Sequence, residues 1–372
     1  MQKTFKCLTY TFVLQLAFFF FAQVSWAKES KIPISIPDNL VKIESVYGAD
    51  ESVGVWIVHV QDAHCVVEAQ KNTQRLIDYL QRKYGLKHVY LEGGEGKLNT
   101  AILRDYPNLE VKQAVLEKYL ARGEISGAEY AACVNEKPAS YFGIENQSLY
   151  DLNRKILLEA DRSRARRDQI LVDLRKRIEM KLSRTKPIDS KNAELSESLK
   201  QVDLLLRASR LDLERKDYQK FIEIYRNLSK SAPLFFHALG ITEQSEDWVD
   251  LASFFAPVIK FYELVLKRDL AMSFNVLRRV REDKPKVAVL ITGGFHSEGI
   301  GRILSRAGIS TVVVTPKFTS WMGKENYIPV LRKNLKKGQV PSTEKVTSSP
   351  FAQSLLMEMQ VASPSLKHSA KE

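Results

Sequence analysis

Two short, largely apolar runs near opposite ends of the chain are each followed by a histidine. The first run covers residues 55–60 and precedes His64, and the second covers residues 287–292 and precedes His296. Apolar runs of this length that end in turn-forming residues are typical of buried strands in an α/β sheet. In open sheets of this kind, ligand sites lie beyond the carboxyl ends of the strands. We therefore expect both histidines at one edge of a common sheet.

Patterns next to these runs extend each of them into a strand–helix–strand unit. Apolar residues recur at helical spacing over residues 65–82, and a short apolar run follows at residues 88–91. Residues 286–315 repeat this order near the C-terminus. Parallel crossovers of this type are nearly always right-handed. The sequence thus predicts an α/β domain, with a mostly parallel central sheet and flanking helices, formed by residues 28–147 and 284–335.

A different composition separates the two parts of this domain. Residues 149–228 contain no glycine, and their leucines and isoleucines recur at helical spacing on both sides of a break near Pro187. This pattern predicts a long antiparallel α-helical hairpin within an insertion that spans residues 148–283. Residues 148–186 contain 12 Lys and Arg against 6 Asp and Glu. That surplus is typical of a solvated helix face, and the alternative is contact with an anionic surface or partner.

The two ends of the chain differ from the rest. Residues 1–27 begin with two lysines, continue with an apolar stretch and end in small residues, as secretory signal peptides do. We expect cleavage after Ala27 and export, to the periplasm or by secretion, with retention as a membrane anchor as the alternative. Residues 336–372 are rich in Lys, Ser, Pro and Thr, which predicts a disordered tail. The formal net charge of +12 favours anionic partners, but no motif indicates a specific nucleic acid.

Two cysteines, Cys65 and Cys133, lie beyond the predicted signal peptide. Exported proteins meet oxidising conditions, which would allow these two residues to form a disulfide. The alternative is that both are small buried apolar residues. Because Cys65 directly follows His64, its oxidation state would affect a site there.

Carboxylates follow two further predicted strands. Glu92 comes directly after residues 88–91, and Glu145 follows the short apolar run of residues 141–144. Because the carboxyl ends of parallel strands meet at one edge of a sheet, these side chains are expected to converge with the two histidines. The residues predicted to be catalytic, and also to be metal ligands, are His64, Glu92 and His296.

A helix that begins directly after His64 would place Glu68 one turn away on the same face. Glu68 and Glu145 are therefore predicted to help bind a cofactor. Two histidines and one carboxylate form a known ligand set for zinc and for non-haem iron, which predicts a divalent metal ion of unspecified identity. Without a metal, the same groups can catalyse hydrolysis by general acid–base chemistry, with one histidine activating water. Two further histidines in strands, His59 and His88, are interpreted as structural.

The order of these motifs resembles a known superfamily. The segments are Gln61-Asp62-Ala63-His64, Leu91-Glu92-Gly93 and Gly293-Gly294-Phe295-His296. They are similar to the superfamily that joins erythromycin-esterase-like proteins, ChaN haem-binding lipoproteins and TIKI/TraB proteins. The resemblance covers residues 53–146 and 284–316, and it implies an α/β fold with an early and a late Gly-x-x-His turn. The late turn fits this pattern, whereas Gln61 stands where the early turn typically has glycine.

The resemblance implies two alternative functions. The first is an exported, metal-dependent hydrolase of peptidase or esterase type, which acts on a small-molecule or peptide substrate. The second is a haem- or iron-binding uptake protein of the ChaN type without catalytic activity, in which a tyrosine at a surface cleft holds the haem. The tyrosines considered for that role are Tyr106, Tyr119, Tyr130 and Tyr141. A third hypothesis, drawn from the charge pattern, is an adhesion or scaffold module that acts through the basic helical segment.

Overall fold

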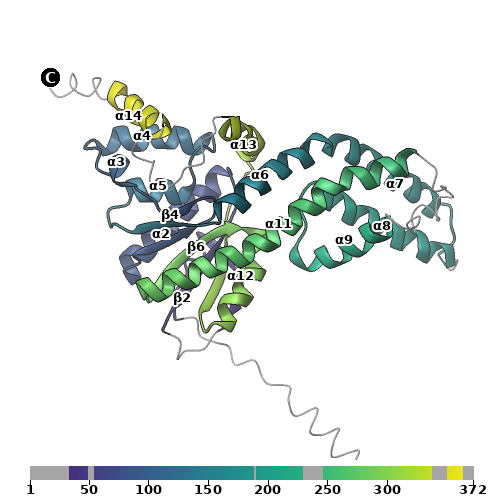
Figure 1. The fold of residues 1–372 in the computed structure, drawn as a ribbon, viewed down its shortest axis with the longest axis horizontal. Helices are drawn as coiled ribbons and strands as arrows, with labels where there is room; N and C mark the ends of the chain where they lie inside the picture. The colour runs from purple at the N-terminus through teal and green to yellow at the C-terminus, as the bar shows by residue number, and fades with distance from the viewer. Residues whose placement is uncertain (1–32, 49–53, 188–189, 229–245, 337–349, 363–372) are drawn as a thin grey trace, which may run out of the picture.

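A seven-stranded mixed sheet forms the centre of the protein (Figure 1). The computed structural model describes residues 33–48, 54–187, 190–228, 246–336 and 350–362. The strands are β1 (Val41–Tyr47), β2 (Trp56–Asp62), β3 (His88–Leu91), β4 (Glu95–Lys97), β5 (Ser140–Ile144), β6 (Val287–Gly293) and β7 (Ser310–Pro316). Their order in the sheet is β1-β7-β2-β6-β3-β5-β4. The five inner strands are parallel, and the edge strands β1 and β4 are antiparallel to their neighbours. The predicted α/β fold class is confirmed.

Helices cover both faces of this sheet. In the first half of the chain they are α2 (Val67–Tyr84), α3 (Ala101–Arg104), α4 (Leu109–Ala121), α5 (Gly127–Val134) and α6 (Gln147–Arg162). The later ones are α7 (Arg164–Leu182), α8 (Ser190–Ser209), α9 (Arg215–Leu228), α11 (Glu246–Asp283), α12 (Gly294–Arg306), the 3-10 turn η1 (Lys324–Asn326), α13 (Tyr327–Lys336) and α14 (Pro350–Ala362). Side chains alternate along β2, so Val58 packs with Leu76 of α2, whereas Ile57 packs on the other face with Val276 of α11. Two apolar layers thus enclose the sheet.

A separate hydrophobic core joins helices α7, α8, α9 and α11. Leu171, Leu205, Phe221 and Phe255 contribute one fully buried side chain from each of these helices. In the chain, α6 to α11 follow β5 and precede β6. Figure 1 shows α7, α8 and α9 beyond the end of the sheet, while α11 runs back to it. The long helix α11 therefore belongs to both cores and carries side chains from the helical part to the sheet.

The helix after β2 begins two residues later than predicted. Cys65 has a φ of 62°, in the left-handed region that an α-helix cannot include. A turn from Ala63 to Val66 precedes the first helical residue, Val67. This difference matters for the site, because it changes which side chains of the helix point the same way as His64.

Most of the predicted tail, residues 337–349 and 363–372, lies outside the described residues, and the described part is a helix. Residues 350–362 form α14, and Leu355 and Met359 of this helix are fully buried against a cluster that includes residues of α4. Its apolar positions, four residues apart, lie on one helix face, which explains why this part of a polar tail is ordered. The predicted signal peptide, residues 1–27, lies outside the described residues. Among the helices that the structure describes, none is long and apolar enough to span a membrane.

Candidate functional site

His64, Glu92 and His296 converge at the carboxyl edge of the sheet, as predicted. They follow β2, β3 and β6, and β6 lies between the other two strands. Asp62 of β2 is in register with Gly293 of β6. A Cβ atom placed on Gly293 would lie 3.6 Å from Oε2 of Glu92, 3.7 Å from Nε2 of His64 and 3.8 Å from Cδ2 of His296. The three side chains thus surround one point above the end of β6.

His64 is oriented by a carboxylate and by an aromatic ring. Its Nδ1 donates a hydrogen bond to Oδ2 of Asp62 at 2.6 Å, and the other oxygen of Asp62 accepts one from Gln70, also at 2.6 Å. The imidazole stacks on Tyr327 of α13, with ring centres 5.1 Å apart and planes 3° from parallel. These contacts fix the ring and leave Nε2 directed towards Gly293.

The charge state of His64 follows from these neighbours. Burial disfavours the cation, but the charge and the hydrogen bond of Asp62, helped by Glu92, outweigh it and raise the pKa of His64 to about 9. The side chain is 38% exposed, because it faces a cavity. At neutral pH and without a ligand, His64 is therefore mainly an imidazolium ion.

His296 lies in the first turn of α12 and is also paired with a carboxylate. Its Nδ1 donates to Oδ1 of Asp269 at 2.5 Å, and its Nε2 is 3.5 Å from Oε1 of Glu92. Burial would lower the pKa of His296, but Glu92 and the hydrogen bond of Asp269 raise it above the usual value. Asp269 is in turn ion-paired with Arg215 of α9. The helical part of the chain thus supplies the residues that hold His296.

The negative charge of Glu92 is balanced by an arginine that the sequence did not indicate. Its Oε1 accepts a hydrogen bond from Arg268 of α11 at 2.5 Å, and its Oε2 accepts one from the backbone N–H of Gly293 at 2.6 Å. Burial would raise the pKa of Glu92, but His296 and Arg268 hold it well below the usual range. Arg268 also pairs with Glu145 and donates to Asn153 at 2.8 Å. Glu92 is therefore a permanent anion in a buried network.

This donor set does not suit a divalent cation. Both oxygens of Glu92 already accept hydrogen bonds. A metal ion bound to Glu92 would also lie close to the positively charged guanidinium of Arg268, which would repel it. With a pKa of about 9, His64 would have to lose a proton to become a ligand, and the raised pKa of His296 likewise favours its cation over the neutral ligand form. Within the described ranges, no group of three His, Cys, Asp or Glu is arranged to hold a metal ion.

Glu68 does not take part in the site, contrary to the prediction. Its carboxylate accepts hydrogen bonds from the backbone N–H groups of Thr319, at 2.6 Å, and of Ser320, at 3.3 Å. These contacts lower the pKa of Glu68 and fix it on the segment after β7. The reason is the late start of α2, because His64 lies outside the helix and the expected one-turn relationship is lost.

Glu145 supports the site from behind and does not face the cavity. It is fully buried, and both of its oxygens contact Arg268. Burial, together with the nearby charge of Glu92, raises its pKa despite the arginine. The predicted cofactor-binding role of Glu145 is replaced by a structural one, which is to position Arg268.

His59 occupies the structural position that was predicted. It is fully buried in β2, and its Nε2 lies 2.8 Å from Oγ1 of Thr292. Burial and the charge of His296 lower its pKa to about 3. The ring is therefore neutral at physiological pH and acts as a hydrogen-bonded spacer below the site.

The two cysteines are free, buried thiols. Cys65 donates weakly to the carbonyl of Gly123 at 3.8 Å. Burial raises the pKa of Cys65 to about 11 and that of Cys133 to about 12. Both are therefore poor nucleophiles, and the structure follows the alternative of small buried residues.

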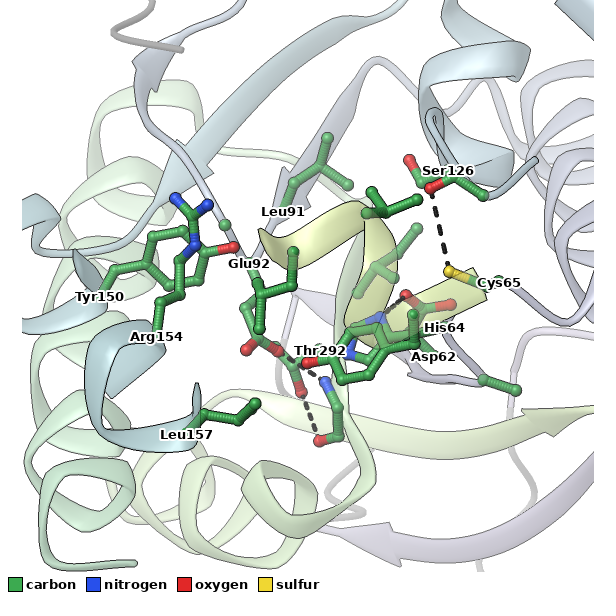
Figure 2. Close-up of a pocket in the computed structure, with 18 of the residues that line it drawn as sticks. Asp62, His64, Cys65, Leu91, Glu92, Ser126, Tyr150, Arg154, Leu157 and Thr292 are labelled. Carbon is green, nitrogen blue, oxygen red and sulfur yellow. Dashed lines mark hydrogen bonds and ion pairs between the residues drawn. The ribbon is translucent and has the colours of Figure 1, made fainter. Parts of the chain in front are cut away.

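A cavity of about 1190 Å³ opens over these residues. One face of α6 lines it, together with parts of α11, the start of α12 and α13. Figure 2 shows His64 and Glu92 among the lining residues, with Tyr150 and Arg154 of α6 on the other side of Glu92 from His64 in this view. Its volume is somewhat above the range of about 300–1,000 Å³ that is typical of small-molecule sites. Asp62, His64, Glu92, Arg268 and His296 all belong to its wall.

The tyrosines of this cavity are not the predicted ones. Tyr150, Tyr262 and Tyr327 line it, and burial raises the pKa of Tyr150 to about 12. The four that the haem hypothesis considered lie elsewhere. Tyr106 and Tyr119 donate to residues of α14, Tyr130 donates to Glu117, and Tyr141 is buried in the sheet core.

Sequence patterns missed Arg268, Asp269 and Arg215. Each lies within a helix, in a segment where charged side chains are frequent and normally solvated. The available signal was the pair Arg268-Asp269 inside a largely apolar stretch of α11, because adjacent opposite charges there need buried partners.

Comparison with known proteins identifies no relative of established function. No protein-family model and no curated protein matches the chain. One solved structure, a crystal structure of a Bacillus cereus protein, aligns with 16% sequence identity and a TM-score of 0.20. The alignment covers 63% of this chain and 56% of that protein. This chain thus spans little more than half of that protein, and a TM-score this low carries no functional inference. The fold and site define an α/β protein with paired His–Asp groups at the sheet edge.

Proposed function

We propose that this protein is a hydrolase in which His64 activates water. The observation that carries this proposal is the Asp62–His64 pair with a free Nε2 at the floor of a cavity. Asp62 accepts a hydrogen bond from the N–H at Nδ1, so the lone pair of a neutral His64 is on Nε2, where it can remove a proton from water. The resulting hydroxide attacks a carbonyl carbon, and the proton on Nε2 then passes to the leaving group as the acyl bond breaks.

His296 has a different role from His64 in this proposal. Its pKa is raised, and it lies beside Glu92 in the first turn of α12, where the helix dipole favours negative charge. A cationic imidazole at this position stabilises the oxyanion that develops during the attack. Glu92 and Arg268 keep each other charged and hold His296 close to Gly293. The substrate class is a peptide or an ester, and no metal is needed for these steps.

The proposal also covers the location of the protein and the role of its helical part. We propose that the chain is exported, that α6 to α11 form an insertion in the α/β domain, and that the basic surface of this insertion meets anionic surfaces. The charge pattern of residues 148–186 and the second core of the helical part support the last two points.

Substitution of His64, with the same substitution of His88 as the control, tests whether the protein is a hydrolase that depends on His64. The full chain is assayed against a panel of aryl esters and short peptides, with His64→Asn compared with His88→Asn. His88 is the control because it begins β3 and lies outside the cavity wall. We expect His64→Asn to lose about 10²–10⁴-fold in kcat/KM, as general-base removal typically does. His88→Asn should stay within about twofold. Equal activity of the two variants, or no turnover of the whole panel by the wild type, would refute the proposal.

A chelator and a haem titration separate the alternatives. Metal analysis of the purified protein, with activity measured before and after EDTA, should show no dependence on a metal. A strict requirement for metal would instead restore the metal-dependent form of the hypothesis. A Soret band on addition of haem, lost in Tyr150→Phe or Tyr327→Phe, would favour the uptake protein, because these tyrosines line the cavity.

A further inference from the structure

One arginine of the cavity wall, Arg154, is buried and has no hydrogen-bonded carboxylate, whereas Arg164, which pairs with Asp161, is 49% exposed. Four arginines line the wall: Arg154, Arg164, Arg210 and Arg268. Carboxylate oxygens lie 3.4 Å from Arg164, 3.1 Å from Arg210 and 2.5 Å from Arg268. Arg154 differs, because the oxygen of its partner Asp151 is 3.7 Å from Nη1, which is too far for a hydrogen bond.

Arg154 is also deeply buried. It is 6% exposed, and its Nε makes no hydrogen bond to any described residue. The facing oxygen of Asp151, Oδ1, likewise has no hydrogen bond. A guanidinium has five N–H donors, and burial without acceptors costs free energy. Arg154 is therefore held in a state that an acceptor entering from the cavity would stabilise.

The helix surface around Arg154 directs it to that cavity. Tyr150, Asn153, Arg154 and Leu157 are three or four residues apart on α6, so they share one helix face, and all four line the cavity. The guanidinium lies 5.4 Å from the ring centre of Tyr150, which limits its movement. In Figure 2, Arg154 and Tyr150 stand next to each other on the side of Glu92 away from His64.

We propose that Arg154 binds an anionic group, a carboxylate or a phosphate, on the ligand of this cavity. The guanidinium binds two oxygens of such a group in parallel, whereas a neutral amide offers only one. Aromatic side chains of the same cavity, Tyr150 beside Arg154 and Tyr327 beside His64, contact the apolar part of the ligand. This inference rests on the proposed hydrolase for the role of the ligand as substrate, but the binding itself needs no turnover.

A matched pair of probes tests the charge requirement on the wild-type protein. Calorimetric titration compares 3-phenylpropionate with its amide, 3-phenylpropionamide, which has the same shape without the charge. Phenyl phosphate forms the third arm and separates the two anions. We expect at least one anion to bind ten or more times tighter than the amide. Equal binding of the amide and both anions, or binding of none of the three, would overturn the proposal.

Three variants assign the preference to Arg154. Arg154→Met keeps the unbranched apolar stem, removes the guanidinium and should abolish the preference for the anion, whereas Arg154→Lys should retain part of it. Arg164→Met is the control, because Arg164 lines the same cavity with a carboxylate partner, and it should bind like the wild type. An unchanged preference in Arg154→Met would overturn the proposal. Should that variant not fold, Arg154→Gln takes its place, with the same expected loss of the preference, and an unchanged preference there would overturn the proposal.

His64→Asn distinguishes this inference from the proposed function. This variant should lose turnover and still prefer the anion. Loss of the preference in Arg154→Met, together with unaltered turnover in His64→Asn, would support the anion site and refute the role of His64 as the base that activates water.

Discussion

His296 and Asp269 lie on different helices, α12 and α11, yet Nδ1 of the histidine is 2.5 Å from Oδ1 of the aspartate. Gly299, one turn after His296, makes this approach feasible. A Cβ on Gly299 would overlap both Asp269 and the Arg215 side chain paired with it. The close packing of the helical part on α12 therefore depends on the absence of a side chain at this position.

The first prediction is that Gly299→Ala destabilises the fold and lowers activity. The added methyl group must push Asp269 and Arg215 away from His296, and overpacking of this kind costs about 1–3 kcal/mol. Denaturant unfolding measures the loss, and kcat/KM should fall about tenfold as His296 loses its orientation. Gly54→Ala is the control, because no atom lies within 4 Å of a Cβ there, and it should stay within about 0.5 kcal/mol. Equal stability of the two variants would contradict the packing described.

A second prediction concerns acid stability and His59. Its pKa in the fold is about 3, below the model-peptide value of 6.5, because it is buried beside His296. Below pH 6.5 the unfolded chain therefore binds a proton at His59 that the folded protein does not bind. The free energy of unfolding is unaffected by His59 above pH 6.5 and decreases as the pH falls from 6.5 towards 3.

Substitution of His59 by glutamine removes this titration. His59→Gln should be less stable than the wild type at pH 7, by about 1 kcal/mol, since the contact with Thr292 is altered. The difference should shrink as the pH falls and reverse by pH 4, because proton uptake by the unfolded wild type then outweighs the lost contact. Midpoints of urea unfolding at the two pH values give the comparison. A constant difference between the two proteins would show that His59 is not kept neutral.

The third prediction is that α14 is part of the folded domain. Leu355 is fully buried against the cluster around α4, and Tyr119 donates to Glu358 at 2.6 Å. Leu355→Ala should therefore destabilise the protein by about 2–3 kcal/mol, at the lower end for buried leucines because α14 lies at the periphery. Met357 lies on the same helix and is 65% exposed, so Met357→Ala should change the free energy of unfolding by less than about 0.5 kcal/mol. Identical unfolding midpoints of the two variants would contradict the packing of α14 and indicate that this segment is disordered.

Much of the sheet edge could be predicted from the sequence. The strands that precede His64, Glu92 and His296 are short apolar runs, and parallel strands place their carboxyl ends together. Convergence of these residues follows from that rule alone. It needs no knowledge of side-chain contacts, which explains why it could be predicted without a structure.

Contacts that depend on exact helix phase or on distant partners could not be predicted. The expected role of Glu68 failed because Cys65 adopts a left-handed conformation that delays α2. Arg268 was missed because its partner Glu92 is 176 positions away in the sequence. Helical periodicity places Arg268 on a face of α11, but it cannot say that this face meets the sheet edge. Burial of α14 likewise depends on a partner surface, on α4, that the tail itself does not reveal.

The pH dependence of kcat/KM tests the central claim, that Asp62 and His64 activate water. A general base works only when it has lost its proton, and the profile of kcat/KM reports the pKa of the free enzyme. With a pKa of His64 near 9, activity should rise about tenfold per pH unit through neutral pH and level off above pH 9.

Asp62→Asn provides the decisive comparison. Without the carboxylate, burial and Arg268 would lower the pKa of His64, so the rise should move to lower pH, and the plateau should fall about 10²–10⁴-fold. A rise near pH 9 in the wild type, displaced to lower pH in Asp62→Asn, is the result we predict. A wild-type profile that is flat from pH 6 to 9, or one that Asp62→Asn leaves unmoved, would contradict the claim.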